Sequence, residues 1–139
     1  MERYLKILLI LALFFGMAPA LSAQEPMTPE EKEKKFYEFI EKEVERYESS
    51  LKLETWQVFY VDSILTHDYK AMQEEVMDLS KAKVSNSDIY YDVQDRWMEQ
   101  IYQSFQKILS EDQWAKYQKS GAARDKKARD KRAAKKNKQ

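Results

Sequence analysis

One histidine and no cysteine restrict the chemistry that this chain can perform. The histidine, His67, precedes Asp68 and lies near other acidic residues, so it is the first candidate for a metal ligand. His67 and Glu74 are seven residues apart and would share one face of a helix. A single imidazole among flexible surface carboxylates makes a weak metal site, so a solvated helix face is the favoured interpretation. We therefore expect no metal and no cofactor.

Other catalytic patterns are missing as well. The lack of cysteine excludes disulfide frameworks and Cys/His zinc sites, and Ser-His nucleophilic constellations have at most one imidazole to use. Neither glycine nor proline occurs between Glu30 and Ser120, which excludes a P-loop and a G-x-G-x-x-G loop there. No paired carboxylates stand in an apolar setting that would tune them for acid–base catalysis. The sequence predicts a protein that is not an enzyme.

The first 23 residues have the order of a secretory signal peptide. A charged start with Arg3 and Lys6 is followed by an apolar run over residues 7–15 and a small-residue end over residues 18–23. We expect cleavage after Ala23; cleavage after Ala20 and a retained membrane anchor are the alternatives. The mature protein would then be exported.

Charge divides the chain into three segments. Residues 1–23 carry a net charge of +1, residues 24–120 carry −8, and residues 121–139 carry +7, although the total is zero. We interpret these segments as the signal peptide, a helical domain and a basic tail.

The helical domain is predicted from apolar residues at three- and four-residue spacing. Thr28, Pro29 and Glu31 form the start of a first helix, and further helices are expected over residues 54–81, 88–109 and from Ser110 onward. The expected apolar stripe of the second helix comprises Trp56, Tyr60 or Val61, Ile64, Leu65, Tyr69, Met72, Val76 and Leu79. The fold class is therefore all-α, an elongated helical hairpin or bundle of about four helices.

The third helix carries two apolar stripes, and one helix face cannot hold both. The stripe expected to face the bundle comprises Ile89, Val93, Trp97, Ile101, Phe105 and Ile108. The stripe beside it comprises Tyr90, Tyr91, Met98 and Tyr102, and we interpret it as a candidate client-binding or dimer surface. Ordinary core packing is the alternative.

The basic tail has good helix propensity but no apolar face, so it is expected to be a solvated helix or disordered. Its candidate anion-binding residues are Arg124, Lys126, Lys127, Arg129, Lys131 and Arg132. Export and the lack of interleaved aromatic residues argue against nucleic acid. The tail could instead bind an anionic membrane surface, hold the acidic body of another copy, or only solubilise the protein.

Two short motifs recur 56 residues apart. Leu109, Ser110 and Gln113 have the form L-[S/T]-x-x-Q, and Leu53 and Gln57 have the form L-x-x-x-Q. In such a motif a hydroxyl caps the free N–H groups of the helix and the glutamine reaches back to the N–H of the cap residue. The motif fixes a helix start and performs no chemistry.

Two such motifs in a small, exported, cysteine-free helical chain resemble the Spy/CpxP family of periplasmic proteins. The resemblance covers about residues 51–119, and Glu54 departs from it by standing where the family has Thr or Ser. It implies a periplasmic, ATP-independent chaperone or envelope-stress protein, which forms a homodimer and holds partly unfolded clients on an apolar helical surface. The alternative is a structural or interaction protein of the envelope, whose basic tail docks on an anionic membrane or a partner protein.

Overall fold

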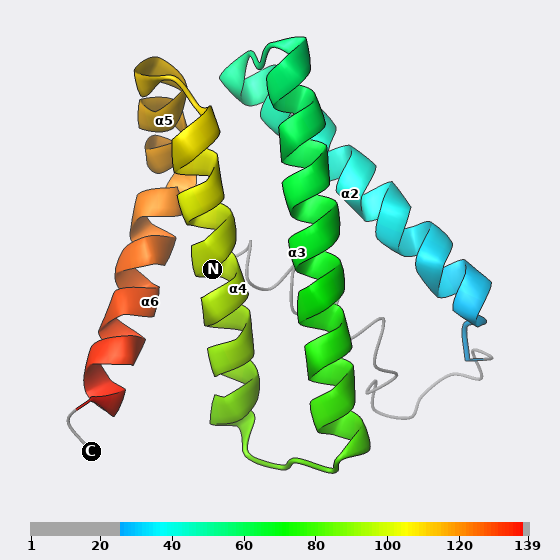
Figure 1. Ribbon diagram of the computed structural model, residues 1–139. Coiled ribbons are helices and arrows are strands. Elements are labelled where there is room, and N and C mark those ends of the chain that lie inside the picture. The colour runs from blue at the N-terminus through cyan, green and yellow to red at the C-terminus, as the bar shows by residue number, and fades with distance from the viewer. Residues whose placement is uncertain (1–25, 138–139) are drawn as a thin grey trace. The chain divides into compact units, whose positions relative to one another are not determined.

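The computed structural model describes residues 26–137, so the predicted signal peptide lies outside the described residues. Within that range the structure is all-α and contains no strand, which confirms the predicted fold class (Figure 1). The chain divides into two compact units, Met1–Phe39 and Ile40–Gln139.

The first unit contains the start of helix α2 (Pro29–Leu51), which continues into the second unit. The predicted capping box is present at this start. The backbone N–H of Glu31 donates to the Thr28 hydroxyl at 3.2 Å, and the Glu31 carboxylate accepts from the Thr28 N–H at 2.9 Å. Two of the free N–H groups at the helix N-terminus therefore have partners.

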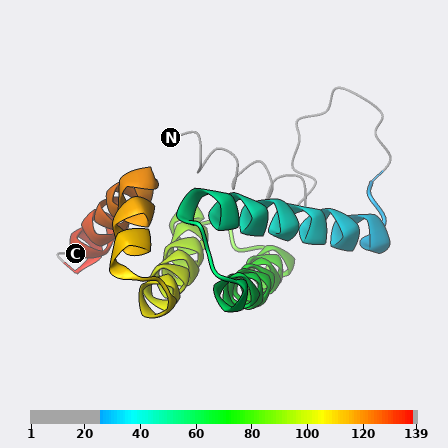
Figure 2. The ribbon, with the colours of Figure 1, turned by 90° about the horizontal axis from the view of Figure 1, so that it is seen from above.

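The second unit contains the end of α2 and four further helices. These are α3 (Thr55–Lys81), α4 (Ser87–Ile108), the short α5 (Glu111–Tyr117) and α6 (Ala123–Lys136). Helices α3 and α4 form an antiparallel hairpin, and α4 lies between α3 and α6 in both views (Figures 1 and 2). The basic tail is thus a helix from Ala123 onward, and the alternative of a disordered segment does not hold for residues 123–136.

The core of the second unit is built from residues four apart on α3 and α4. Phe105 is fully buried, and its ring packs edge-on against Tyr47 of α2 at 5.1 Å between centroids and in a tilted arrangement against Tyr117 of α5 at 5.3 Å. The other buried apolar side chains of α3 and α4 are those of Val61, Leu65, Tyr69, Met72, Val76, Val93 and Ile101. Phe105 thereby joins three helices.

Part of the predicted apolar stripe of α3 was wrong. The inward face contains Gln57, Val61 and Leu65, whereas Trp56 and Tyr60 are about half exposed. Residues 56 and 60 follow one four-residue pattern along this helix, and residues 57, 61 and 65 follow another. Because the Gln57 amide is buried, the second pattern faces the core. On α4, Ile89 is also exposed rather than buried, because it lies in the first helical turn beside the connector.

A π-helical turn, Gln118–Ala122, joins α5 to α6. Gly121 there has φ 116°, a conformation that glycine adopts without the steric cost that a Cβ would add. The resulting kink lets α6 run back along α4 in the antiparallel direction.

Truncating Phe105 should destabilise the fold. We expect Phe105→Ala to lower the free energy of unfolding by about 3–5 kcal/mol, because it leaves a cavity between three helices. Urea unfolding followed by circular dichroism measures this loss. The matched control is Phe59→Ala, since Phe59 is 68% exposed; equal losses for the two variants would contradict the assignment of the core.

Candidate functional site

The two motifs found in the sequence meet in space. Gln57, in the first turn of α3, and Gln113, in the first turn of α5, exchange two side-chain hydrogen bonds of 2.6 and 2.9 Å. Both side chains are buried, with 3% of Gln57 and 9% of Gln113 exposed. The resulting amide pair ties together two helix starts that are 56 residues apart.

Each glutamine also makes one bond within its own motif and one to the opposite motif. The Gln57 oxygen accepts from the Glu54 N–H at 2.9 Å, and the Gln113 oxygen accepts from the Ser110 N–H at 3.0 Å. The Gln57 amide group donates to the Ile108 carbonyl at 2.9 Å, as Gln113 does to Lys52 at 3.3 Å. Lys52 and Ile108 each precede the leucine of a motif, so the network is nearly symmetric.

This network is structural. Both amides use their donors and acceptors on one another and on the backbone, which satisfies polar groups that would otherwise be costly to bury. The Ser110 hydroxyl accepts from the Gln113 N–H at 3.3 Å and completes the second cap. Leu53 and Leu109 are half-buried beside the two caps.

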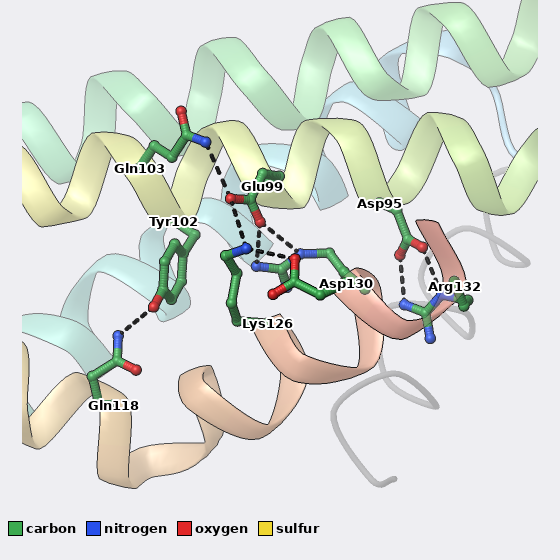
Figure 3. A network of polar contacts seen from close by, with 9 residues as sticks. Asp95, Glu99, Tyr102, Gln103, Gln118, Lys126, Asp130 and Arg132 are labelled. Carbon is green, nitrogen blue, oxygen red and sulfur yellow. Dashed lines mark hydrogen bonds and ion pairs between the residues drawn. The ribbon is translucent and has the colours of Figure 1, made fainter. Parts of the chain in front are cut away.

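The cations of the basic tail divide between two faces of α6. Arg132 forms a two-pronged ion pair with Asp95 of α4, with both contacts at 2.6 Å (Figure 3). Arg129 donates to Glu99 at 3.1 and 3.3 Å. Lys126 reaches the same Glu99 at 3.4 Å, and Lys136 pairs with Asp92. Arg129 is only 6% exposed, so this pair is largely withdrawn from water. The inner face of α6 is therefore held to α4 by charge.

The outer face carries the remaining candidate residues. Lys127 and Lys131 are exposed, as is Lys135 farther along the helix. Arg124 is exposed and pairs with the neighbouring Asp125 at 3.1 Å. A hydrogen bond to Asp130 raises the pKa of the inner Lys126. Of the six candidate anion-binding residues, Lys126, Arg129 and Arg132 thus already pair with carboxylates of α4.

The predicted tyrosine and methionine surface of α4 is partly covered. The Tyr102 ring packs against Trp114 at 4.9 Å and lies 5.5 Å from the Arg129 guanidinium. Its hydroxyl accepts from Gln118 at 2.9 Å (Figure 3). Met98 is half-buried, and the half-buried Tyr90 donates to the Val84 carbonyl. Only Tyr91 of this set is well exposed.

The region of His67 contains a buried carboxylate. Asp68 is buried and accepts from the Gln100 amide at 2.9 Å, and the His67 ring nitrogen Nδ1 lies 2.7 Å from the same Asp68 oxygen. The His67 side chain itself is largely exposed. Over residues 26–137, no group of three or more His, Asp or Glu side chains is arranged to hold a metal ion.

An aromatic cluster that the sequence did not single out lies at the start of α3. Trp56, Phe59 and Tyr60 are 49%, 68% and 50% exposed. The Tyr60 ring lies 6.0 Å from that of Trp56 and 5.8 Å from that of Phe59. The sequence does contain a signal for this cluster. Its aromatic residues stand beside Gln57 and Val61, and the side chains of all these positions cannot face the core. We call these three residues the α3 aromatic cluster.

No protein-family model, no curated protein and no solved structure matches this chain. Among the described residues, no helix has the length and apolar character needed to span a membrane.

Breaking the amide pair should cost stability. Gln57→Leu removes both hydrogen bonds between the amides and takes the side-chain partner from the Glu54 N–H and the Ile108 carbonyl, so we expect a loss of about 2–4 kcal/mol in the free energy of unfolding. The double variant with Gln113→Leu should lose less than the sum of the single losses by at least ~1 kcal/mol. Chemical unfolding of the four proteins measures this coupling. Gln106→Leu, at an exposed position of α4, is the control, and additive losses would show that the two amides do not act together.

Weakening the inner ion pairs should loosen α6. Glu99→Gln removes the charge that faces Arg129 and Lys126, so we expect amide hydrogens of residues 123–136 to exchange about tenfold faster, which corresponds to about 1.4 kcal/mol. Hydrogen exchange with mass spectrometry measures the change, and the exchange of α3 should stay constant. Glu45→Gln on α2 is the control, and unchanged exchange in α6 after Glu99→Gln would show that another contact holds this helix.

Proposed function

We propose that this protein is a periplasmic, ATP-independent chaperone that binds partly unfolded client proteins through the α3 aromatic cluster. The observation that carries the proposal is the grouping of Trp56, Phe59 and Tyr60, each about half exposed or more, at one end of one helix. Grouped exposed apolar side chains mark interaction surfaces, whereas scattered ones are ordinary.

The cluster has the properties needed for binding many different clients. Positions 56, 59 and 60 share one face of α3, and the Tyr60 ring makes edge contacts with the rings of Trp56 and Phe59. Aromatic rings give large contact area with few rotatable bonds, so little conformational entropy is lost when a client binds. The Glu54 carboxylate accepts from the Trp56 indole at 2.6 Å and thereby helps to position the first ring.

The size of the cluster predicts weak and reversible binding. If each ring has about 100 Å² left to bury, complete burial of all three would contribute about 7 kcal/mol before the costs of association. Those costs are of similar size, so one cluster alone gives low affinity. A chaperone that releases its client without ATP needs low affinity of this kind, and a homodimer would present two clusters to one client.

The resemblance to the Spy/CpxP family supports the same proposal. It rests on the two capping motifs, whose glutamines the structure brings together at the starts of α3 and α5. The resemblance also supplies the expectations of a periplasmic location, a homodimer and a role in envelope stress. The covered position of Tyr102 is the reason why we assign client binding to α3 rather than to the tyrosine and methionine stripe of α4.

The test is suppression of client aggregation by the mature chain, residues 24–139. A chemically unfolded enzyme is diluted into buffer with equimolar protein, and light scattering is followed. We expect wild type to suppress at least about half of the scattering and Phe59→Ser/Tyr60→Ser to lose most of this effect, because two of the three apolar contacts are removed.

The matched control is Tyr37→Ser/Tyr91→Ser, which removes two tyrosines that are 46% and 47% exposed elsewhere on the chain. This variant should act like wild type. Unchanged scattering with wild-type protein would refute the chaperone assignment. Equal losses for both double variants would refute the assignment to α3.

A further inference from the structure

Helix α6 has a second face that no contact within the described structure explains. Its inner cations pair with Asp92, Asp95 and Glu99 of α4. Three further lysines, Lys127, Lys131 and Lys135, are exposed. We call these three residues the outer lysine stripe.

The outer lysine stripe is a regular linear array. Its members are four residues apart, so they lie within about 80° of arc and extend about 12 Å along the helix. Over residues 26–137 none of the three has an ion-pair partner, because the two carboxylates of α6 are held by other cations. Asp125 pairs with Arg124, and Asp130 pairs with Lys126 at 2.6 Å.

The contacts of the inner face fix the orientation of the stripe. Arg129 and Arg132 hold α6 against α4, so the outer lysines point away from that helix on a backbone that is already ordered. A partner that binds the stripe does not have to order the helix, and this lowers the entropic cost of binding.

The chemistry of the stripe identifies the kind of partner. The only apolar side chains on α6 are alanines, so its outer face has nothing to insert into an apolar groove and recognises charge alone. The lysine ammonium is a compact point charge, whereas the arginine guanidinium makes paired hydrogen bonds to a single carboxylate or phosphate. Lysines therefore suit a continuous anionic surface. No aromatic residue accompanies them on α6 to stack on nucleic acid bases.

We infer that the outer lysine stripe docks this protein on the surface of an anionic lipid bilayer, with α6 lying parallel to the membrane at the level of the headgroups. Attraction of this kind is worth about fivefold in binding for each lysine near the surface. It involves no residue of the α3 aromatic cluster, so it is independent of the proposed chaperone function.

The test compares binding to vesicles of phosphatidylcholine alone with binding to vesicles that also contain about 30% phosphatidylglycerol. The full sequence is expressed and the resulting protein is purified without further processing. Its binding to the vesicles is measured by co-sedimentation at low salt. Comparing the two vesicle types cancels any binding by apolar residues. We expect about 100-fold tighter binding to the anionic vesicles than to the neutral ones, and K127Q/K131Q/K135Q should lose nearly all of this preference, down to the level seen with neutral vesicles.

The matched control is K34Q/K35Q/K42Q, which removes three exposed lysines of α2 and changes the net charge equally. It should bind within about threefold of wild type. An equal loss in both triple variants would overturn the inference, because net charge alone would then explain the binding. So would equal binding to both vesicle types, or binding to a DNA duplex without binding to anionic vesicles. The aggregation assay on the same stripe variant should stay unchanged, which separates this inference from the proposed function.

Discussion

The buried pair of Gln57 and Gln113 is the interaction on which the second unit depends. Each side-chain amide caps its own helix and also bonds to the opposite motif, so two helix starts and the turns before them are fixed together. A buried amide is tolerated only when its donors and acceptors are satisfied, and here each glutamine satisfies the other. Because α5 begins at this point, the pair also sets where the chain leaves α4 and hence where α6 can return along it.

Helix α4 links the other elements because one of its faces packs in the apolar core and the other forms ion pairs with α6. One face buries Val93, Ile101 and Phe105 in the core, and the stabilisation there comes from apolar burial. The other face presents Asp92, Asp95 and Glu99 to a helix that has no large apolar side chain. Because Arg129 is buried beside Glu99, solvent and salt screen this ion pair less than they screen an exposed one.

The fold followed from the sequence because its signals are local. The capping boxes at Thr28 and Ser110 and the four-residue apolar spacing depend only on neighbouring residues, and they predicted the helix starts within a residue or two. The pairing of Gln57 with Gln113 and the docking of α6 are contacts over 30 or more residues, which no local pattern encodes. The α3 aromatic cluster was missed because its residues and the buried ones share the same four-residue period. Burial of a polar side chain, Gln57, decided between them, and a count of apolar residues alone could not do so.

The placement of the tail against α4 leaves only part of its positive charge exposed. The sequence shows a segment of +7, but its inner cations are neutralised by the acidic face of α4, and the outer lysine stripe carries charge that remains exposed. Salt should act differently on the two sets, because screening is strong for exposed charges and weaker for the buried Arg129 and the half-buried Glu99. There should therefore be a range of ionic strength in which α6 stays docked on α4 while its outer face no longer attracts anions. Over that range, a loss of membrane binding would report on the outer lysines themselves and not on release of the helix that carries them.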